Sequence, residues 1–297
     1  MRNFIILFNE KAGTSPLVRL LDKFDSISVV HQENNTGFEP FDRHNCGRMS
    51  LVDLEQCLDT IYGQGPRSTE ALNRIYTKKA KRPLAAMSEE GVVGFKMRFS
   101  PPRPYPFHID RFPAWNRLSA RLFRKHYMRS FRNTMFDILK RHDVVVLLAV
   151  RQDVLRLGLS IYHGDGTGQP GHLQFKLARG VIDRDAIGKI NVDCERLETI
   201  ISKCEAMHAE KRLLMEELTQ AGIQTHPILY EEFVVSKRNY LMNLFEGLEL
   251  EISSDEVSRV SSQEEYLKKV HSDDISEFVE NHEEVLNTFS DRFVSWR

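Results

Sequence analysis

The stretch NFIILFNEKAGTSPLVRLL, residues 3–21, decides the fold of this chain. Residues 4–8 are an apolar, β-branched run of the length expected for a buried strand. A polar turn containing Gly13 follows, and leucines then recur at helical spacing, with Ser15 as the predicted N-cap and Pro16 as the first helical residue. A strand, a glycine turn and a helix N-terminus together favour an anion, because backbone N–H groups and the helix dipole point at it.

The side chains of this turn strengthen the prediction of an anion site. Lys11 adds a positive charge, and Thr14 and Ser15 add hydroxyl groups. The Walker pattern G-x-x-x-x-G-K-S/T is absent, which disfavours an ordinary ATP or GTP loop. A strand, turn and helix without any ligand remains the alternative interpretation. The residues predicted to hold a phosphate or sulfate group are Lys11, Ala12, Gly13, Thr14 and Ser15.

A second candidate anion motif follows the most apolar segment of the chain, residues 143–150. This segment is predicted to be a buried strand, so Arg151 lies at its carboxyl end and Ser160 lies on the helix that follows. A planar guanidinium group binds phosphate through two parallel hydrogen bonds, and a hydroxyl group adds one more donor. The alternative is a capped strand followed by an ordinary helical serine.

The two motifs together resemble those of the sulfotransferases. Residues 11–15 resemble the K-x-G-T-S/T loop that holds the 5′-phosphosulfate of 3′-phosphoadenosine 5′-phosphosulfate (PAPS). Residues 151–162, RQDVLRLGLSIY, resemble the motif that holds its 3′-phosphate, especially in the bacterial branch that sulfates trehalose and nodulation factors. The resemblance implies that PAPS is the co-substrate, that no metal is required, and that Lys11 is the catalytic cation beside the leaving oxygen.

The order of predicted elements indicates the fold class. Strands alternate with helices along the chain, which predicts an α/β fold: a P-loop-like three-layer sandwich with a mostly parallel central sheet and helices on both faces. We expect residues 1–297 to form a single domain, with a Pro-rich, lid-like insertion at residues 100–113. The other predicted strands are residues 27–31, 91–99 and 225–230, and the main predicted helices are residues 50–62, 115–141, 195–221 and 274–289.

Composition narrows the possible partners. The net charge is −1, so nothing in the overall charge predicts attraction to nucleic acid or to acidic membranes. Four scattered cysteines without C-x-x-C spacing favour neither a zinc site nor a disulfide framework, which fits a cytoplasmic protein. No apolar run is long enough to predict a membrane span. An oligomer is neither indicated nor excluded.

The general base and the acceptor site are sought beyond the second predicted strand. Residues 38–41, FEPF, resemble the F-E-P-L/V segment of carbohydrate sulfotransferases, which implies that Glu39 is the base near the acceptor. Lys96 and Arg98 approach the same sheet edge and are predicted to touch the acceptor or the sulfate, with a salt bridge inside the sheet as the alternative. The candidate bases are His31, Glu33, Glu39, Asp42 and His44, of which Glu39 and His44 are also predicted to bind the acceptor.

Three later features complete the interpretation. Lys268 and Lys269 occupy a place where relatives close a basic loop over the nucleotide, although a surface basic cluster is the alternative. Tyr230 and Glu231 resemble a Y-E-D/E-L/F strand end and are interpreted as structural. Residues 166–171 fit G-x-G-x-x-G but follow no strand, so we do not interpret them as a dinucleotide site.

The predicted function is therefore transfer of a sulfuryl group from PAPS to a hydroxyl group of a carbohydrate, glycolipid or small metabolite. One alternative is a nucleotide-dependent, kinase-like phosphotransferase. The other is a non-catalytic module that binds a nucleotide or a sulfated glycan through the basic helical face of residues 121–132.

Overall fold

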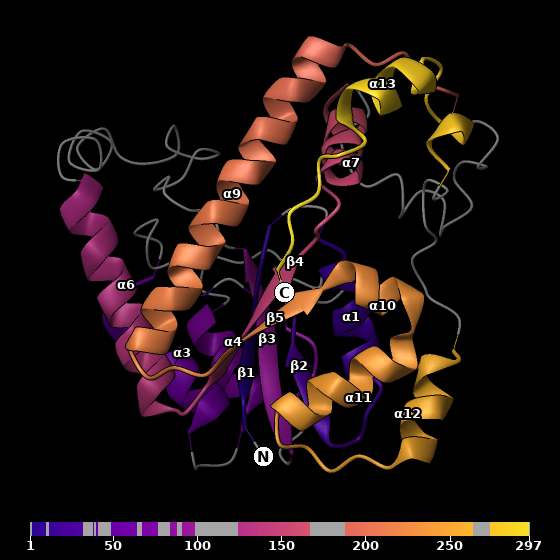
Figure 1. Cartoon of the computed structure of the whole chain (residues 1–297). Coiled ribbons are helices and arrows are strands. Elements are labelled where there is room, and N and C mark those ends of the chain that lie inside the picture. The colour runs from indigo at the N-terminus through magenta and orange to yellow at the C-terminus, as the bar shows by residue number, and fades with distance from the viewer. Residues whose placement is uncertain are drawn as a thin grey trace.

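A parallel β-sheet forms the centre of the molecule (Figure 1). The computed structural model describes residues 2–9, 12–31, 38, 40, 49–63, 67–76, 84–87, 91–98, 124–166, 188–263 and 274–296. Within these residues, five strands pair in the order β2-β3-β1-β4-β5, and every pairing is parallel. The strands are β1 (Phe4–Phe8), β2 (Ile27–Val30), β3 (Val92–Arg98), β4 (Val145–Val150) and β5 (Thr225–Leu229).

Strand β1 lies in the middle of the sheet because its residues are apolar on both faces. Ile5 and Leu7 join the core on one face, and Phe4 and Ile6 join the core on the other, as the two-residue period of a strand requires. A β-carbon at Gly94 of β3 would lie 2.3 Å from the Phe4 ring, so the glycine makes room for that ring. The sequence-based prediction of a buried first strand is confirmed.

Helices cover both faces of the sheet, as Figure 1 shows. Those on the first face are α3 (Leu51–Tyr62), α4 (Thr69–Tyr76), α6 (Arg124–Arg141) and the second half of α9 (Cys194–Gln220). Those on the second face are α1 (Thr14–Leu21), α10 (Tyr230–Val235), α11 (Lys237–Gly247) and α12 (Ser254–Ser261). This arrangement confirms the predicted P-loop-like, three-layer α/β fold.

A third apolar cluster lies beyond the carboxyl edge of the sheet. The first half of α9 extends past the strands and lies beside α7 and α13 (Figure 1). Asp193 caps α9 by accepting hydrogen bonds from the N–H groups of Glu195 and Arg196. The elements that complete this cluster are α7 (Val154–Gly166), the 3₁₀ helix η4 (Ile275–Glu277) and α13 (His282–Phe289).

The structure corrects three boundaries predicted from the sequence. Helix α1 begins at Thr14 with Gly13 as its N-cap, not Ser15, because Gly13 adopts φ 71° and turns the chain into the helix earlier. Tyr230 begins α10 instead of ending β5. The helix predicted for residues 274–289 is divided into η4 and α13. The predicted lid at residues 100–113 lies outside the described residues.

Candidate functional site

The candidate site lies at the carboxyl edge of the sheet, between β1 and β4. These neighbouring strands are followed by connections that run in opposite directions, to β2 through α1 and to β5 through α7 and α9. The helix α1 packs on one face of the sheet, and the second half of α9 packs on the other. In open α/β sheets, ligands bind in the crevice that such a reversal creates.

The turn after β1 presents the N-terminus of α1 at this crevice. The Ala12 N–H group donates to the carbonyl oxygen of Asn9 (3.4 Å), and Gly13 then takes its left-handed conformation. Gly13 contributes no side-chain acceptor to the N–H groups of the first helical turn. Pro16 is the third residue of the helix and has no N–H group to offer. The described part of the turn therefore has the geometry expected of an anion site.

Lys96 places a buried ammonium group beside this helix end. Its side chain is 4% exposed, and its Nζ atom lies 2.7 Å from the Oγ atom of Ser15 and 4.7 Å from the centre of the Phe8 ring. The register that sets Lys96 opposite Ile6 directs its side chain toward the face covered by α1. Lys96 thus lies at the sheet edge where the sequence analysis expected it. The contact described here joins its ammonium group to the hydroxyl group of Ser15.

Tyr230 joins the two predicted anion motifs. Its ring covers Gly13 so closely that a β-carbon there would lie 2.3 Å from the ring atom Cδ2. The guanidinium group of Arg151 lies over the same ring, 4.7 Å from its centre. The sequence interpretation treated Tyr230 as structural and missed this role, although an aromatic residue directly after a strand of a parallel sheet was the available signal.

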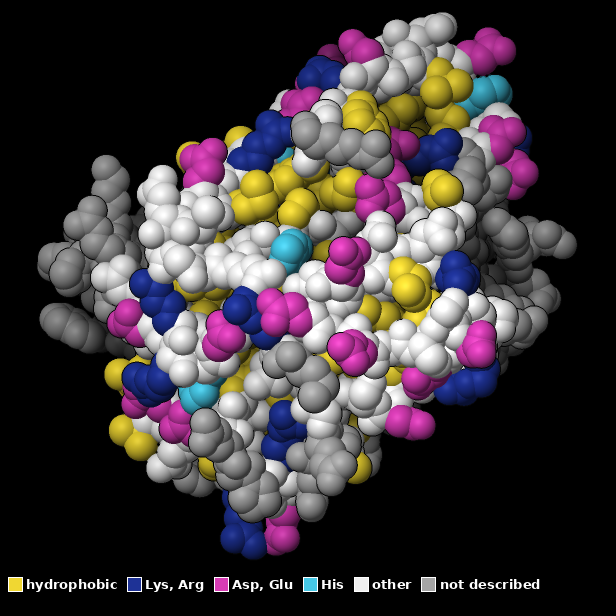
Figure 2. All heavy atoms as spheres, turned by 60° about the horizontal axis from the view of Figure 1, so that its bottom comes forward, with side chains coloured by type: hydrophobic (Ala, Val, Ile, Leu, Met, Phe, Trp, Pro, Cys, Tyr) yellow, Lys and Arg dark blue, Asp and Glu magenta, His cyan; other side chains and the backbone are white. Residues whose placement is uncertain are grey.

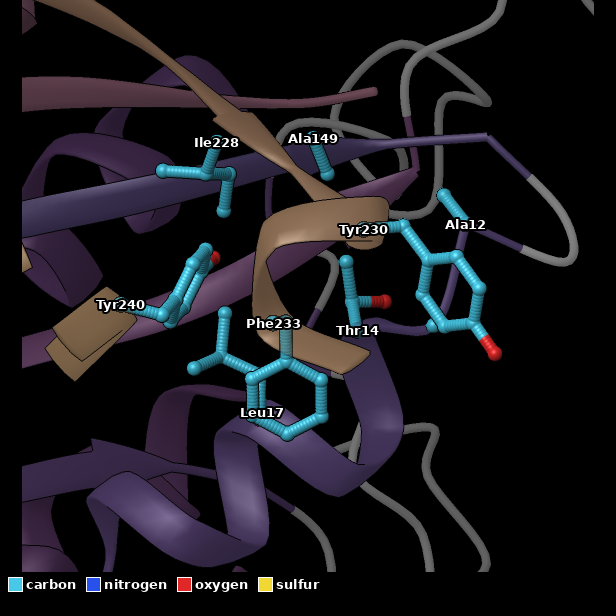
Figure 3. Close-up of a pocket in the computed structure, with 9 residues that line it drawn as sticks. Ala12, Thr14, Leu17, Ala149, Ile228, Tyr230, Phe233 and Tyr240 are labelled. Carbon is cyan, nitrogen blue, oxygen red and sulfur yellow. The ribbon is translucent and has the colours of Figure 1, made fainter. Parts of the chain in front are cut away.

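A small pocket lies behind the turn (Figure 3). The space that the centre of a water molecule can occupy in it is about 10 Å³, enough for a single water and far too small for a nucleotide. The hydroxyl group of Tyr230 points away from Phe233 and Tyr240 (Figure 3). The residues that line the pocket are Ala12, Gly13, Thr14, Leu17, Ala149, Ile228, Tyr230, Phe233 and Tyr240.

Three titratable residues of α9 lie beneath the end of β4, and the sequence interpretation missed them. The Nζ atom of Lys211, which is 3% exposed, donates to the carbonyl oxygen of Ala149 at 2.6 Å. Burial lowers the pKa of Lys211 to about 7, lowers that of His208 to about 4, and raises that of Cys204 to about 12. Their helical spacing on the inner face of α9 was the signal for them.

The structure brings together six of the predicted site residues at one edge. These are Ala12, Gly13, Thr14, Ser15, Lys96 and Arg151. Ser160 lies on α7, the helix that follows Arg151, as predicted. Gly158 faces α9, so Ser160, two residues later, lies on another side of α7. The predicted residues Lys11, Glu39, His44, Lys268 and Lys269, and the side chain of Arg98, lie outside the described part of the chain.

The candidate bases are only partly described. The Nε2 atom of His31 lies 3.1 Å from a carboxylate oxygen of Asp22, so that ring is directed at an acidic partner. Phe38 is fully buried, and its N–H group donates to the carbonyl oxygen of Lys96 (3.4 Å). Glu33 and Asp42 lie outside the described residues, as Glu39 and His44 do.

Neither a membrane-spanning helix nor a metal-binding cluster occurs among the described residues. No helix there has both the length and the apolar character needed to cross a membrane. Among the same residues, no cluster of three or more His, Cys, Asp or Glu side chains could hold a metal ion. On the face of the molecule shown in Figure 2, acidic and basic side chains are interspersed.

Comparisons with known proteins gave structural likeness alone. No protein-family model matches the chain, and no curated protein matches it. Among solved structures, a sulfotransferase from Alicyclobacillus acidocaldarius is 15% identical, with 98% of this chain and 92% of that chain covered and a TM-score of 0.40. A sulfotransferase from Mycobacterium avium is 12% identical, with 98% of this chain and 75% of that chain covered and a TM-score of 0.37.

Proposed function

We propose that this chain is a sulfotransferase that moves a sulfuryl group from PAPS to a hydroxyl group of a carbohydrate, glycolipid or small metabolite. The observation that carries the proposal is the contact between Lys96 and Ser15. This contact sets the ammonium group of Lys96 at the helix end whose N–H groups and dipole already favour negative charge. Both features would strengthen the binding of a phosphosulfate group at this helix end.

The 5′-phosphosulfate of PAPS would lie on the turn after β1. Backbone N–H groups of residues 13–15 would bind its oxygens, and Thr14 and Ser15 carry hydroxyl groups there. Lys11 and Lys96 would supply the positive charge. The 3′-phosphate would be bound by Arg151, which follows the neighbouring strand, together with Ser160, Lys268 and Lys269.

The reaction requires charge stabilisation and one proton acceptor. The bond between sulfur and the bridging oxygen of PAPS breaks, a bond between sulfur and the acceptor oxygen forms, and 3′-phosphoadenosine 5′-phosphate (PAP) leaves. Negative charge develops on the bridging oxygen, where we assign the ammonium group of Lys11. Glu39 would take the proton of the acceptor hydroxyl, and His44, Lys96 and Arg98 would contact the acceptor or the sulfuryl group.

The remaining predictions belong to the same proposal. The acceptor is a small molecule or a glycan, no metal takes part, and the protein works in the cytoplasm without nucleic acid as a partner. A kinase-like phosphotransferase is the alternative, and it would prefer ATP with Mg²⁺.

Calorimetric titration with PAP, ADP and ATP tests the proposal. We expect PAP to bind more tightly than ADP, because only PAP carries the 3′-phosphate. Arg151→Ala should weaken PAP binding by about 10- to 100-fold, the loss of a charged hydrogen bond, and should leave ADP binding nearly unchanged. Arg141→Ala is the control, since Arg141 precedes the opposite end of β4 and contacts Glu55. A preference for ATP with Mg²⁺, or equal binding of PAP and ADP, would overturn the proposal.

A further inference from the structure

Residues 149–154 span the end of β4, the turn that follows it and the first residue of α7, and groups from distant parts of the chain hold this segment at several backbone positions. Lys211 donates to the carbonyl oxygen of Ala149 (2.6 Å), and the N–H group of Asp153 donates to a carboxylate oxygen of Glu231 (3.0 Å). Such external support fixes a turn far more firmly than its own short-range hydrogen bonds do. Arg151 lies in the middle of this turn.

Residues 292–296, here called the strap, supply most of the other contacts. The N–H group of Val294 donates to the backbone carbonyl oxygen of Gln152 (3.0 Å). The backbone N–H group of Trp296 donates to the side-chain oxygen Oε1 of Gln152 (3.0 Å). The carbonyl oxygen of Arg292 accepts from the N–H group of Val154 (3.3 Å). Gln152 is only 9% exposed, so the strap holds the residue next to Arg151 on both its backbone and its side chain.

The strap is itself anchored on α9. The guanidinium group of Arg292 contacts Glu198 (2.9 Å) and Glu205 (3.0 Å), and these contacts raise the pKa of Arg292. The guanidinium group of Arg212 donates to the carbonyl oxygen of Ser295 and lies over the Trp296 ring, 5.3 Å from its centre. Three side chains of α9 thus fix both ends of the strap.

His208 connects the strap to Arg151 directly. The indole N–H group of Trp296 donates to the Nδ1 atom of His208 (3.0 Å), so Nδ1 carries no proton and Nε2 does. His208 also interacts with the backbone of Arg151, and this interaction opposes the lowering of the His208 pKa. Trp296, His208 and Arg151 therefore form a continuous chain of contacts.

We propose that Trp296 and Gln152 are positioning residues for Arg151: the strap and His208 hold the turn after β4 so that the guanidinium group of Arg151 is presented to the 3′-phosphate. The identity of that ligand rests on the function proposed above. A group that is already in place loses little conformational freedom when it binds, so preorganisation strengthens binding without adding any contact to the ligand. Residues far along the chain thereby become part of the nucleotide site.

Trp296→Phe tests the proposal with a small change, because it keeps an aromatic ring and removes the indole N–H group. We expect the dissociation constant for PAP to rise by about 3- to 10-fold, the effect of one hydrogen bond, while that for ADP stays nearly constant. In an Arg151→Ala background the same change should have no further effect on PAP binding, since the two residues would act as one unit. Gln152→Met, which removes the Oε1 acceptor, should behave in the same way.

Hydrogen exchange without any nucleotide provides an independent readout. In the Trp296→Phe protein we expect the amides of residues 149–154 to exchange several-fold faster than in the wild type, whereas the amides of β1 should be unaffected. Leu286→Ala is the control, because it trims an exposed side chain of α13 and leaves the contacts of the strap in place.

The results of these experiments test the positioning role of Trp296 and Gln152 separately from the proposed function. Unchanged exchange in the turn, or an equal loss of PAP affinity in the presence and absence of Arg151, would overturn the positioning role even if the wild type binds PAP well. Faster exchange together with no PAP binding by the wild type would overturn the proposed function and the ligand assigned to Arg151, while showing that the strap holds the turn.

Discussion

The ring of Tyr230 rests on the backbone of Gly13, and a β-carbon at position 13 would lie 2.3 Å from the ring atom Cδ2 and 2.6 Å from Cε2. The contact joins the turn after β1 to the first residue of α10. Because Arg151 lies over the same ring, Tyr230 couples the two halves of the proposed nucleotide site. Any change that displaces this ring should affect both halves together.

Gly13→Ala is expected to weaken PAP binding by more than about 10-fold, since the new methyl group displaces Tyr230 and with it Arg151. The substitution also forces a residue with a β-carbon to adopt φ 71°, which costs about 1–2 kcal/mol of stability. Calorimetric titration with PAP and urea unfolding measure the two effects separately.

Gly222→Ala is the matched control for Gly13→Ala. Gly222 has φ 75°, but nothing lies within 4 Å of a β-carbon built there. The two variants should therefore lose similar stability from backbone strain, and only Gly13→Ala should lose PAP affinity. Normal PAP binding by Gly13→Ala would contradict the role assigned to Tyr230.

Lys96→Met should lower both PAP affinity and turnover, because it removes the buried charge beside Ser15 and keeps a side chain of similar length. If Lys96 contacts the sulfuryl group in the transition state, turnover should fall by about 10²–10³. Steady-state rates with PAPS and titration with PAP distinguish the two effects. Lys203→Met removes the same charge from an exposed position on α9 and should leave both values unchanged. A Lys96→Met enzyme as fast as the wild type would rule out the assigned contact.

Stability should rise with pH above neutrality because of Lys211. Burial lowers the pKa of Lys211 to about 7 in the folded chain, from its ordinary value of 10.5. Between these two values the unfolded chain binds a proton that the folded chain has released, so the free energy of unfolding increases as the pH rises. Below about pH 7 both states are protonated, and this dependence disappears.

Lys211→Met should remove this dependence. The wild type should gain up to about 1.4 kcal/mol per pH unit relative to the variant between pH 7.5 and 9.5, as measured by urea unfolding. Lys203→Met serves again as the exposed control and should follow the wild type. Parallel profiles for the wild type and Lys211→Met would show that Lys211 keeps its ordinary pKa.

Much of the fold could be predicted from local sequence patterns. The apolar runs of β1 and β4 are short, bounded by polar turns and recognisable without a partner. The strand order could not be predicted, because an apolar run does not reveal which neighbour it pairs with. The N-cap of α1 was assigned wrongly, since Ser15 is the better capping residue by type and the left-handed conformation of Gly13 is settled by its packing against Tyr230.

Some residues of the candidate site could likewise be predicted from local sequence patterns, and others could not. Gly13 and Arg151 were found because each belongs to a contiguous motif at a strand end. Tyr230, His208 and Lys211 were missed as site residues because their importance comes from contacts with residues distant in the sequence. Lys96 was placed at the correct edge, but its contact with Ser15 depends on the pairing of β3 with β1.

The central place of β1 also determines the order in which the molecule can fold. Among the described strands β1 pairs with β3 and β4 alone, so it has neither of these neighbours until residue 98 has been synthesised, and its second neighbour ends at residue 150. Closing such long loops makes folding slow, and an unpaired apolar strand aggregates readily in the meantime. During synthesis, β1 and the turn that follows it would therefore need protection, by a chaperone or by the ribosome surface, until β4 has emerged.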